Sequence, residues 1–242
     1  MTKIVVFGDS HTKFFGKEQT LSSLYHLGDF YENSICHIYD GATIKGFGKR
    51  KSTLNIREKI LGEIMQNDIV VLCFGQVDIE LGIYFKKFVK CEDESLDDFL
   101  TVLIQSYQLL IDMVKPQAKE VIIKGVNLPV LIEHKKAVRY THRIISENLS
   151  DKEEIQKTRQ KLAKGFPGIH QRISFSKLLN EKLQHLARAN GVGYFDINAK
   201  ISYSNGLVKE EFIPAFFDHH LADTLQVRLI HWECLKNAVS SI

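Results

Sequence analysis

Short apolar segments rich in β-branched residues alternate along this chain with longer segments in which apolar residues recur at helical spacing. Segments that are apolar on both faces are typical of buried strands in a parallel sheet, because helices cover such a sheet on both sides. The pattern predicts strands at residues 3–7, 34–39, 68–74, 120–126 and 193–197. It predicts helices at residues 54–66, 96–114, 173–189 and 224–239.

Strands that alternate with helices indicate β-α-β units, which assemble into an α/β fold around a parallel sheet. Sheets of this kind bind their ligands at the carboxyl ends of the strands. The residues that directly follow each predicted strand are therefore the first place to look for chemistry.

Length and composition fit one domain spanning residues 1–242. The chain is 44% hydrophobic and 25% charged, which indicates a folded protein with a sizeable core and argues against disorder. Its net charge of +3 is too small to favour nucleic acid or a membrane surface as the main partner. No apolar run approaches the ~18 residues of a transmembrane helix.

The segment at residues 130–172 differs from the rest and is predicted to be a helical insertion in that domain. It carries ten Lys or Arg and five Asp or Glu, a net charge of +5. A solvated basic surface and a lid that attracts an anionic substrate both fit this charge.

The four cysteines show no C-x-x-C spacing, which favours neither a zinc site nor a redox pair. The sequence after Met1 lacks the apolar stretch of a secretory signal, so we expect a cytoplasmic protein. The oligomeric state is left open.

The first predicted strand is followed by Gly8-Asp9-Ser10-His11. A serine just beyond the carboxyl end of a central strand is well placed to act as a nucleophile, and N–H groups at the start of a helix can stabilise developing negative charge. Serine and aspartate are also ordinary helix N-caps, so this fragment alone leaves both interpretations open.

Three further segments carry candidate chemistry. A neutral histidine can act as a general base, and a neighbouring carboxylate can hold its tautomer; adjacent histidines are also compatible with a metal site. Glycine in a loop after a strand allows close approach of a ligand to the backbone. The segments are Asp40-Gly41-Ala42-Thr43, Gly75-Gln76-Val77-Asp78 and Asp218-His219-His220-Leu221.

Together with Gly8-Asp9-Ser10, these segments resemble the four sequence blocks of the SGNH/GDSL hydrolase superfamily of esterases and acyl-handling enzymes, over residues 4 to about 225. The resemblance implies a flavodoxin-like three-layer α/β/α sandwich with a central, mostly parallel five-stranded sheet. It also implies no metal and no organic cofactor. The implied catalytic residues are Ser10 as nucleophile, His220 as base and Asp218 as its partner. The implied oxyanion hole comprises Ser10, Gly41 and Gln76, with Gly46 as the alternative glycine. Asp9, His11 and Asp78 are implied to support the site.

Two positions depart from the family pattern. Val77 stands where the family has an oxyanion-binding asparagine, and valine cannot donate a hydrogen bond, so Gln76 or backbone N–H groups would have to serve. Asp218 lies two residues before His220, whereas the family spacing is three. If that spacing fails to orient the imidazole, Ser10 and His220 would work as a dyad.

These features predict a serine-dependent esterase that removes an O-acyl group, above all O-acetyl, from a small molecule or a carbohydrate. The strings GDSHT, GATIKG and FGQVDIE resemble a bacterial branch that often accompanies surface-polysaccharide genes. Three alternatives remain. They are an O-acyltransferase using the same residues, a metal-dependent phosphoesterase with Asp9 and His11 as ligands and His219-His220 as further ligands, and a non-catalytic glycan-binding relative.

Overall fold

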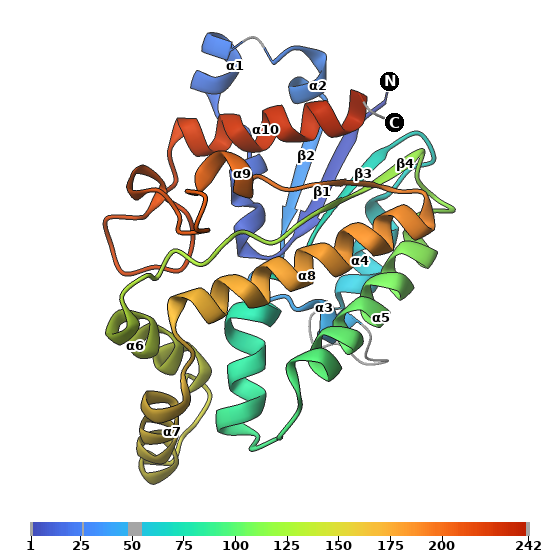
Figure 1. Cartoon of the computed structure of the whole chain (residues 1–242). Helices are drawn as coiled ribbons and strands as arrows, with labels where there is room; N and C mark the ends of the chain where they lie inside the picture. The colour runs from blue at the N-terminus through green and yellow to red at the C-terminus, as the bar shows by residue number, and fades with distance from the viewer. Residues whose placement is uncertain (1, 26, 48–54, 241–242) are drawn as a thin grey trace.

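The computed structural model describes residues 2–25, 27–47 and 55–240. The described part of the chain forms a five-stranded sheet in which every neighbouring pair is parallel (Figure 1). This confirms the predicted α/β sandwich. In spatial order the strands are β2 (Ser34–Ile38), β1 (Ile4–Gly8), β3 (Ile69–Cys73), β4 (Glu120–Lys124) and β5 (Gly193–Phe195).

Each face of the sheet is covered by its own layer of helices, because successive side chains of a strand point to opposite sides. Val5 and Phe7 of β1 pack into one apolar cluster, and Ile4 and Val6 pack into the other. The first layer contains α3 (Ile44–Phe47), α4 (Ile56–Glu63), α5 (Leu96–Val114) and α8 (Ile169–Asn190). The second contains α1 (Gln19–Tyr25), α2 (Asp29–Glu32) and α10 (Leu225–Ser240).

The strand order places a topological switch point at β1. From β1 the chain moves to β2 on one side, and β3 then lies on the other side. The connections therefore leave in opposite directions and open a crevice at the carboxyl end of β1. Because β1 ends at Gly8, residues Asp9 and Ser10 emerge at this crevice.

Residues 130–172, predicted to be a helical insertion, hold α6 (His134–Ile145) and α7 (Lys152–Gly165). These helices lie beyond one end of the sandwich (Figure 1). They share a small apolar cluster with Tyr84 and Phe88, which belong to the helical segment containing the π-type turns η2 (Asp78–Gly82) and η3 (Phe85–Val89). None of the helices in the described part of the chain has the length and apolar character that a membrane crossing requires.

Several predicted boundaries were wrong. The strands predicted to end at residues 126 and 197 end at Lys124 and Phe195. Beyond Lys124 the backbone leaves the ladder, since the N–H of Val126 donates to the Asn180 side chain at 2.7 Å. The helix predicted at 54–66 covers only Ile56–Glu63 among the described residues, and position 54 lies outside them.

The spacing of apolar residues predicted neither the start of α8 nor the shortest helices. Helix α8 begins at Ile169, four residues before the predicted start: Ile169 shares an apolar cluster with Ile173, but the three residues between them are polar and gave too weak a pattern to extend the helix. The short helices α1, α2 and α3 were not predicted. A single turn or two shows too few apolar repeats to define a face.

Gly8 is required at the end of β1 by close packing. A Cβ at this position would collide with the Thr12 hydroxyl and with the backbone carbonyl and Cβ of Cys73. We expect Gly8→Ala to lower the free energy of unfolding by about 2–4 kcal/mol, because backbone atoms cannot move aside as a flexible side chain can. Urea denaturation measures this change.

Gly62→Ala is the matched control for that substitution. Gly62 lies in α4, and nothing stands within 4 Å of the position that its Cβ would take. Alanine in a helix should be neutral or stabilise by about 0.5–1 kcal/mol. Equal stability of the two variants would contradict the packing account of Gly8.

Candidate active site

Ser10 lies where β1 passes into the helical turn η1 (Ser10–Phe15). Asp9 caps this turn, since its Oδ1 accepts the N–H of His11 at 2.9 Å. The cap fixes the backbone on both sides of Ser10 while the serine itself remains half-buried at the crevice.

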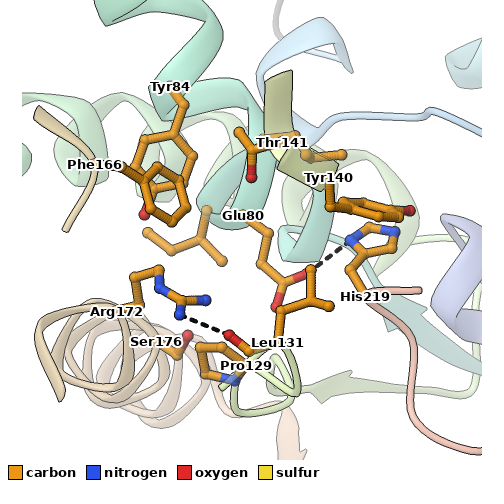
Figure 2. Close-up of a pocket in the computed structure, with 12 residues that line it drawn as sticks. Glu80, Tyr84, Pro129, Leu131, Tyr140, Thr141, Phe166, Arg172, Ser176 and His219 are labelled. Carbon is orange, nitrogen blue, oxygen red and sulfur yellow. Dashed lines mark hydrogen bonds and ion pairs between the residues drawn. The ribbon is translucent and has the colours of Figure 1, made fainter. Parts of the chain in front are cut away.

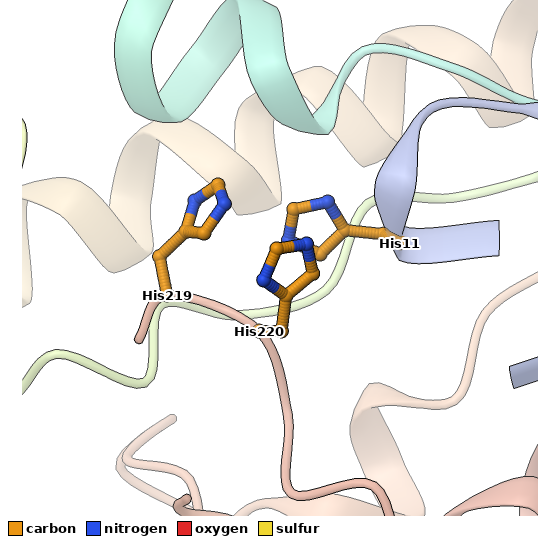
Figure 3. Close-up of side chains that lie close together, drawn as sticks. All are labelled: His11, His219 and His220. Carbon is orange, nitrogen blue, oxygen red and sulfur yellow. The ribbon is translucent and has the colours of Figure 1, made fainter. Parts of the chain in front are cut away.

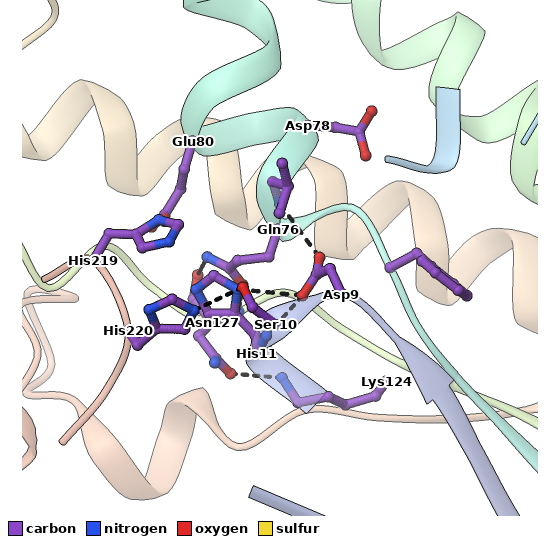
Figure 4. Close-up of polar contacts among 12 residues, drawn as sticks. Asp9, Ser10, His11, Gln76, Asp78, Glu80, Lys124, Asn127, His219 and His220 are labelled. Atoms are coloured by element: carbon purple, nitrogen blue, oxygen red, sulfur yellow. Dashed lines mark hydrogen bonds and ion pairs between the residues drawn. The ribbon is translucent and has the colours of Figure 1, made fainter. Parts of the chain in front are cut away.

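Ser10, His220 and Asp218 form a continuous hydrogen-bonded chain, and Figure 4 shows the contact between Ser10 and His220. His220 Nε2 lies 2.8 Å from Ser10 Oγ, and His220 Nδ1 lies 2.8 Å from Asp218 Oδ1. The two-residue spacing between Asp218 and His220 is enough to bring the carboxylate to the imidazole, because the loop turns around the carboxylate. Asp218 Oδ1 also accepts the N–H of His219 at 2.6 Å. The Tyr140 hydroxyl donates to the same oxygen at 3.3 Å.

Asp218 is held as a carboxylate by its partners. Partial burial raises the pKa of Asp218, but the hydrogen bond and charge of His220 together with the backbone N–H groups outweigh that effect and lower the pKa below its usual range. An ionised Asp218 can keep the proton of His220 on Nδ1 and leave Nε2 free to accept a proton from Ser10.

Asp9 is fully buried and braces the loops around Ser10. Its Oδ2 accepts the N–H of Val77 at 3.4 Å, which ties the end of β1 to the segment after β3. Burial raises the pKa of Asp9 to about 6, against the lowering effect of its backbone hydrogen bonds. His11 Nδ1 lies 3.2 Å from Asp9 Oδ1, so these two side chains face each other. The contact disfavours the phosphoesterase alternative, because His11 and backbone N–H groups already occupy the oxygens with which Asp9 would ligate a metal.

His11 lies directly against the candidate base. Its ring stacks on that of His220 with the centroids 4.1 Å apart. Burial lowers the pKa of His11 well below its usual range, and the neighbouring histidines add to this effect, so His11 is neutral at pH 7. A neutral ring at this position supports the imidazole of His220 without adding a charge.

Asp78 anchors the loop that carries Gly41. Its carboxylate oxygens accept the N–H groups of Ile44 at 2.8 Å and Lys45 at 3.3 Å. Gly41 precedes these residues with a φ of +69° and with open space where a side chain would begin. An L-residue rarely adopts that conformation, so glycine is suited to this exposed turn beside the crevice.

The ionisation of Asp78 should be visible in the pH dependence of stability. Burial raises its pKa to about 7 in the folded protein, from 3.8 in an unfolded chain, despite its two backbone hydrogen bonds. Its contribution is therefore fully present below about pH 4 and is lost as the pH rises towards 7. Relative to Asp78→Asn, the wild type should lose roughly 3–4 kcal/mol of unfolding free energy over this interval.

Chemical denaturation of both proteins between pH 4.5 and 8 measures this difference. Subtracting the variant from the wild type removes the contributions of other titrating groups, including the buried histidines. A difference that stays flat, or that favours the wild type at higher pH, would contradict the assignment.

Gln76 has partners other than a substrate. Its Nε2 donates to the backbone carbonyl of Asn127 at 3.1 Å, and its Oε1 accepts the N–H of Asn127 at 2.6 Å. The side chain thereby joins the segments that follow β3 and β4. Gln76 thus has a bracing contact that uses one of the two N–H donors of its amide, and its role in the oxyanion hole stays a prediction.

Three residues near the site were not singled out by sequence. Glu80 Oε2 lies 2.8 Å from His219 Nδ1, and Tyr140 contacts Asp218 from α6. Lys124 is buried at the end of β4, where its Nζ donates to Asn127 Oδ1 at 2.6 Å and burial lowers its pKa. A lysine within the apolar run at 120–126 was the one available signal, since buried charges are rare without a specific partner.

A pocket opens beside His219, between η2, α6 and α8 (Figure 2). The rings of Tyr84, Tyr140 and Phe166 line it together with the oppositely charged side chains of Arg172 and Glu80. Arg172 is buried, and its Nη2 donates to the carbonyl of Leu131 at 2.7 Å. The pocket therefore combines apolar surface with fixed polar groups, and its cavity volume of about 20 Å³ suits a water molecule.

Solved structures of ester hydrolases match the chain over nearly its whole length. An extracellular lipase from Streptomyces rimosus matches with a TM-score of 0.52 and 14% identity, over 98% of this chain and 100% of that one. A variant of an acetyl-xylooligosaccharide esterase from Geobacillus stearothermophilus gives 0.52 and 14%, over 98% and 94%. A GDSL-like lipase from Bacteroides thetaiotaomicron gives 0.50 and 14%, over 99% and 88%.

This chain shares its fold with these lipases and this esterase. No protein-family model matches the sequence, and a search of curated proteins finds no significant match. Identities this low establish a shared fold and nothing finer. Within the shared fold, the reaction has to be inferred from the side chains at the carboxyl end of β1.

Proposed function

We propose that this protein is a serine-dependent ester hydrolase that works through an acyl-enzyme. The observation that carries the proposal is the continuous chain of hydrogen bonds from Ser10 Oγ through His220 to Asp218. The SGNH/GDSL fold supports it, because solved structures with this fold include lipases and an acetyl-xylooligosaccharide esterase.

In the proposed mechanism, His220 Nε2 takes the proton of Ser10 as Oγ attacks the ester carbonyl. Asp218 stabilises the imidazolium that forms, and His220 then passes the proton to the departing alcohol. Water, deprotonated by the same nitrogen, attacks the acyl-serine; as the bond between the acyl carbon and Ser10 Oγ breaks, His220 returns the proton to Oγ and the carboxylic acid is released. The first of these proton transfers, from Ser10 Oγ to His220 Nε2, follows a contact of 2.8 Å that already exists in the free protein.

The proposed oxyanion hole consists of the backbone N–H groups of Ser10 and Gly41. Val77 contributes no side-chain donor, and Gln76 is held by Asn127. Loss of one such donor costs roughly 10²–10³-fold in kcat in other hydrolases. We therefore expect a slower enzyme on simple esters than a hydrolase with a full set of donors.

The proposed substrate class is a carbohydrate that carries an O-acyl group, above all O-acetyl. Aromatic rings at the site support this: Tyr140 and Phe217 lie edge to face with centroids 5.4 Å apart, beside Asp218. Arg139 lies 4.8 Å from the centroid of the Phe217 ring. Tyr140 is buried and Phe217 half-buried, and Phe216 is exposed next to them in the chain. Aromatic rings beside hydrogen-bonding groups suit sugar rings, which present apolar C–H faces and polar edges.

Hydrolysis of p-nitrophenyl acetate tests the reaction class. We expect turnover by the wild type, loss of roughly 10³-fold or more in Ser10→Ala, and no abolition by EDTA. Acetate release from acetylated oligosaccharides, measured in parallel, tests the substrate class. Turnover that survives in Ser10→Ala, or that EDTA abolishes, would overturn the serine mechanism.

A further inference from the structure

Three histidines meet at the site, and each is arranged in the same way (Figure 3). In every one, Nδ1 lies within reach of a carboxylate oxygen, which leaves Nε2 as the other ring nitrogen. The pairs are His11 with Asp9 at 3.2 Å, His219 with Glu80 at 2.8 Å and His220 with Asp218 at 2.8 Å.

The three histidines come from two distant parts of the chain and converge on one point. His11 follows β1, whereas His219 and His220 lie in the loop before α10. One potential ligand nitrogen from each lies within 4.8 Å of the other two. His11 Nε2 is buried and has no hydrogen-bond partner within the described structure. A buried nitrogen without a partner is costly, and a ligand would satisfy it.

We propose that His11, His219 and His220 form a binding site for a divalent metal ion of the Zn²⁺ type, and that the bound ion inhibits the hydrolase. Three imidazoles with an open fourth position are a known zinc ligand set. Carboxylates on the remote ring nitrogens, as found here, orient such ligands and strengthen binding. Tetrahedral Zn–N bonds of about 2.0–2.1 Å place nitrogens roughly 3.4 Å apart, so modest ring rotation completes the site.

Inhibition follows from the single lone pair on His220 Nε2. The same nitrogen that contacts Ser10 Oγ at 2.8 Å would have to bind the ion. It cannot accept a proton from Ser10 and donate its lone pair to a metal at the same time. Metal binding and ester hydrolysis are therefore mutually exclusive uses of one imidazole.

The matched tests of the site use Co²⁺ as a spectroscopic probe. We expect wild-type protein to bind one Co²⁺ with the intense visible absorption of a four-coordinate site. His219→Gln removes a ligand and should abolish this spectrum, and Glu80→Gln removes only the remote carboxylate and should weaken binding roughly 10–100-fold. His185→Gln, on the exposed face of α8, is the control and should bind as the wild type does. Circular dichroism shows that each variant is folded.

Ser10→Ala separates this proposal from the proposed function. The variant lacks the nucleophile and keeps all three histidines, so its Co²⁺ spectrum should be retained even if no esterase activity exists. For an active wild type, Zn²⁺ should inhibit hydrolysis and EDTA should restore it. Absence of a four-coordinate spectrum, unchanged binding by His219→Gln, or activity that requires the metal would overturn the proposal.

Discussion

Replacing His220 with alanine is expected to lower kcat/KM for ester hydrolysis by roughly 10³–10⁶-fold. His220 Nε2 is the base that contacts Ser10 Oγ at 2.8 Å, and a serine hydroxyl without a base is a weak nucleophile. Initial rates on p-nitrophenyl acetate across a range of substrate concentrations measure the loss. Nearly all of it should fall on kcat, because the imidazole acts in the transition state.

His185→Ala is the control, since that histidine lies on the exposed face of α8 away from the site. It should leave kcat/KM unchanged. A His220→Ala protein that is folded and retains a tenth or more of wild-type activity would show that another group activates Ser10.

The second large effect is expected from Asp218→Asn, which should lower kcat by roughly 10²–10⁴-fold. The amide can donate to His220 Nδ1, and that contact would favour the tautomer whose proton sits on Nε2, where it blocks proton transfer from Ser10. The change preserves size, but His220 Nδ1 and the backbone N–H groups of His219 and His220 all contact the same atom, Oδ1. An amide oxygen placed there would keep these contacts and lose only the negative charge, so either orientation of the amide weakens the support for His220. A pH–rate profile alongside steady-state kinetics would show the altered ionisation of His220.

Asp223→Asn is the isosteric control. Asp223 is paired with Arg228 at 2.8 Å outside the site, so its loss should affect neither kcat nor KM. If Asp218→Asn is as active as Asp223→Asn, Ser10 and His220 work as a dyad and the contact with Asp218 is structural.

The sequence was most informative where one physical rule dominates. The run at residues 69–73 is apolar on both faces, which only a strand covered on both sides explains, and the helix at 96–114 has a strong apolar face and begins and ends where predicted. Helices α1 and α2 are too short for such a pattern. Their positions depend on packing against Trp232, more than two hundred residues from α1.

In the site, too, some residues could be predicted from the local sequence, whereas others depend on contacts between distant parts of the chain. Ser10 could be located because it directly follows a predicted strand, and the sheet topology brings such positions together. Glu80 could not, because its contact with His219 joins residues 139 positions apart. The two-residue spacing between Asp218 and His220 also could not be judged in advance, since it depends on how the loop turns about the carboxylate.

Covalent labelling of Ser10 is the most direct test of the proposed acyl-enzyme. Wild-type protein would be incubated with a fluorophosphonate, digested and examined by mass spectrometry, with Ser10→Ala and His220→Ala treated alongside. We predict one adduct, located on Ser10, that is absent from Ser10→Ala and strongly reduced in His220→Ala. An adduct on another residue, or labelling of wild type and His220→Ala at the same rate, would contradict the assignment of Ser10 as a nucleophile activated by His220.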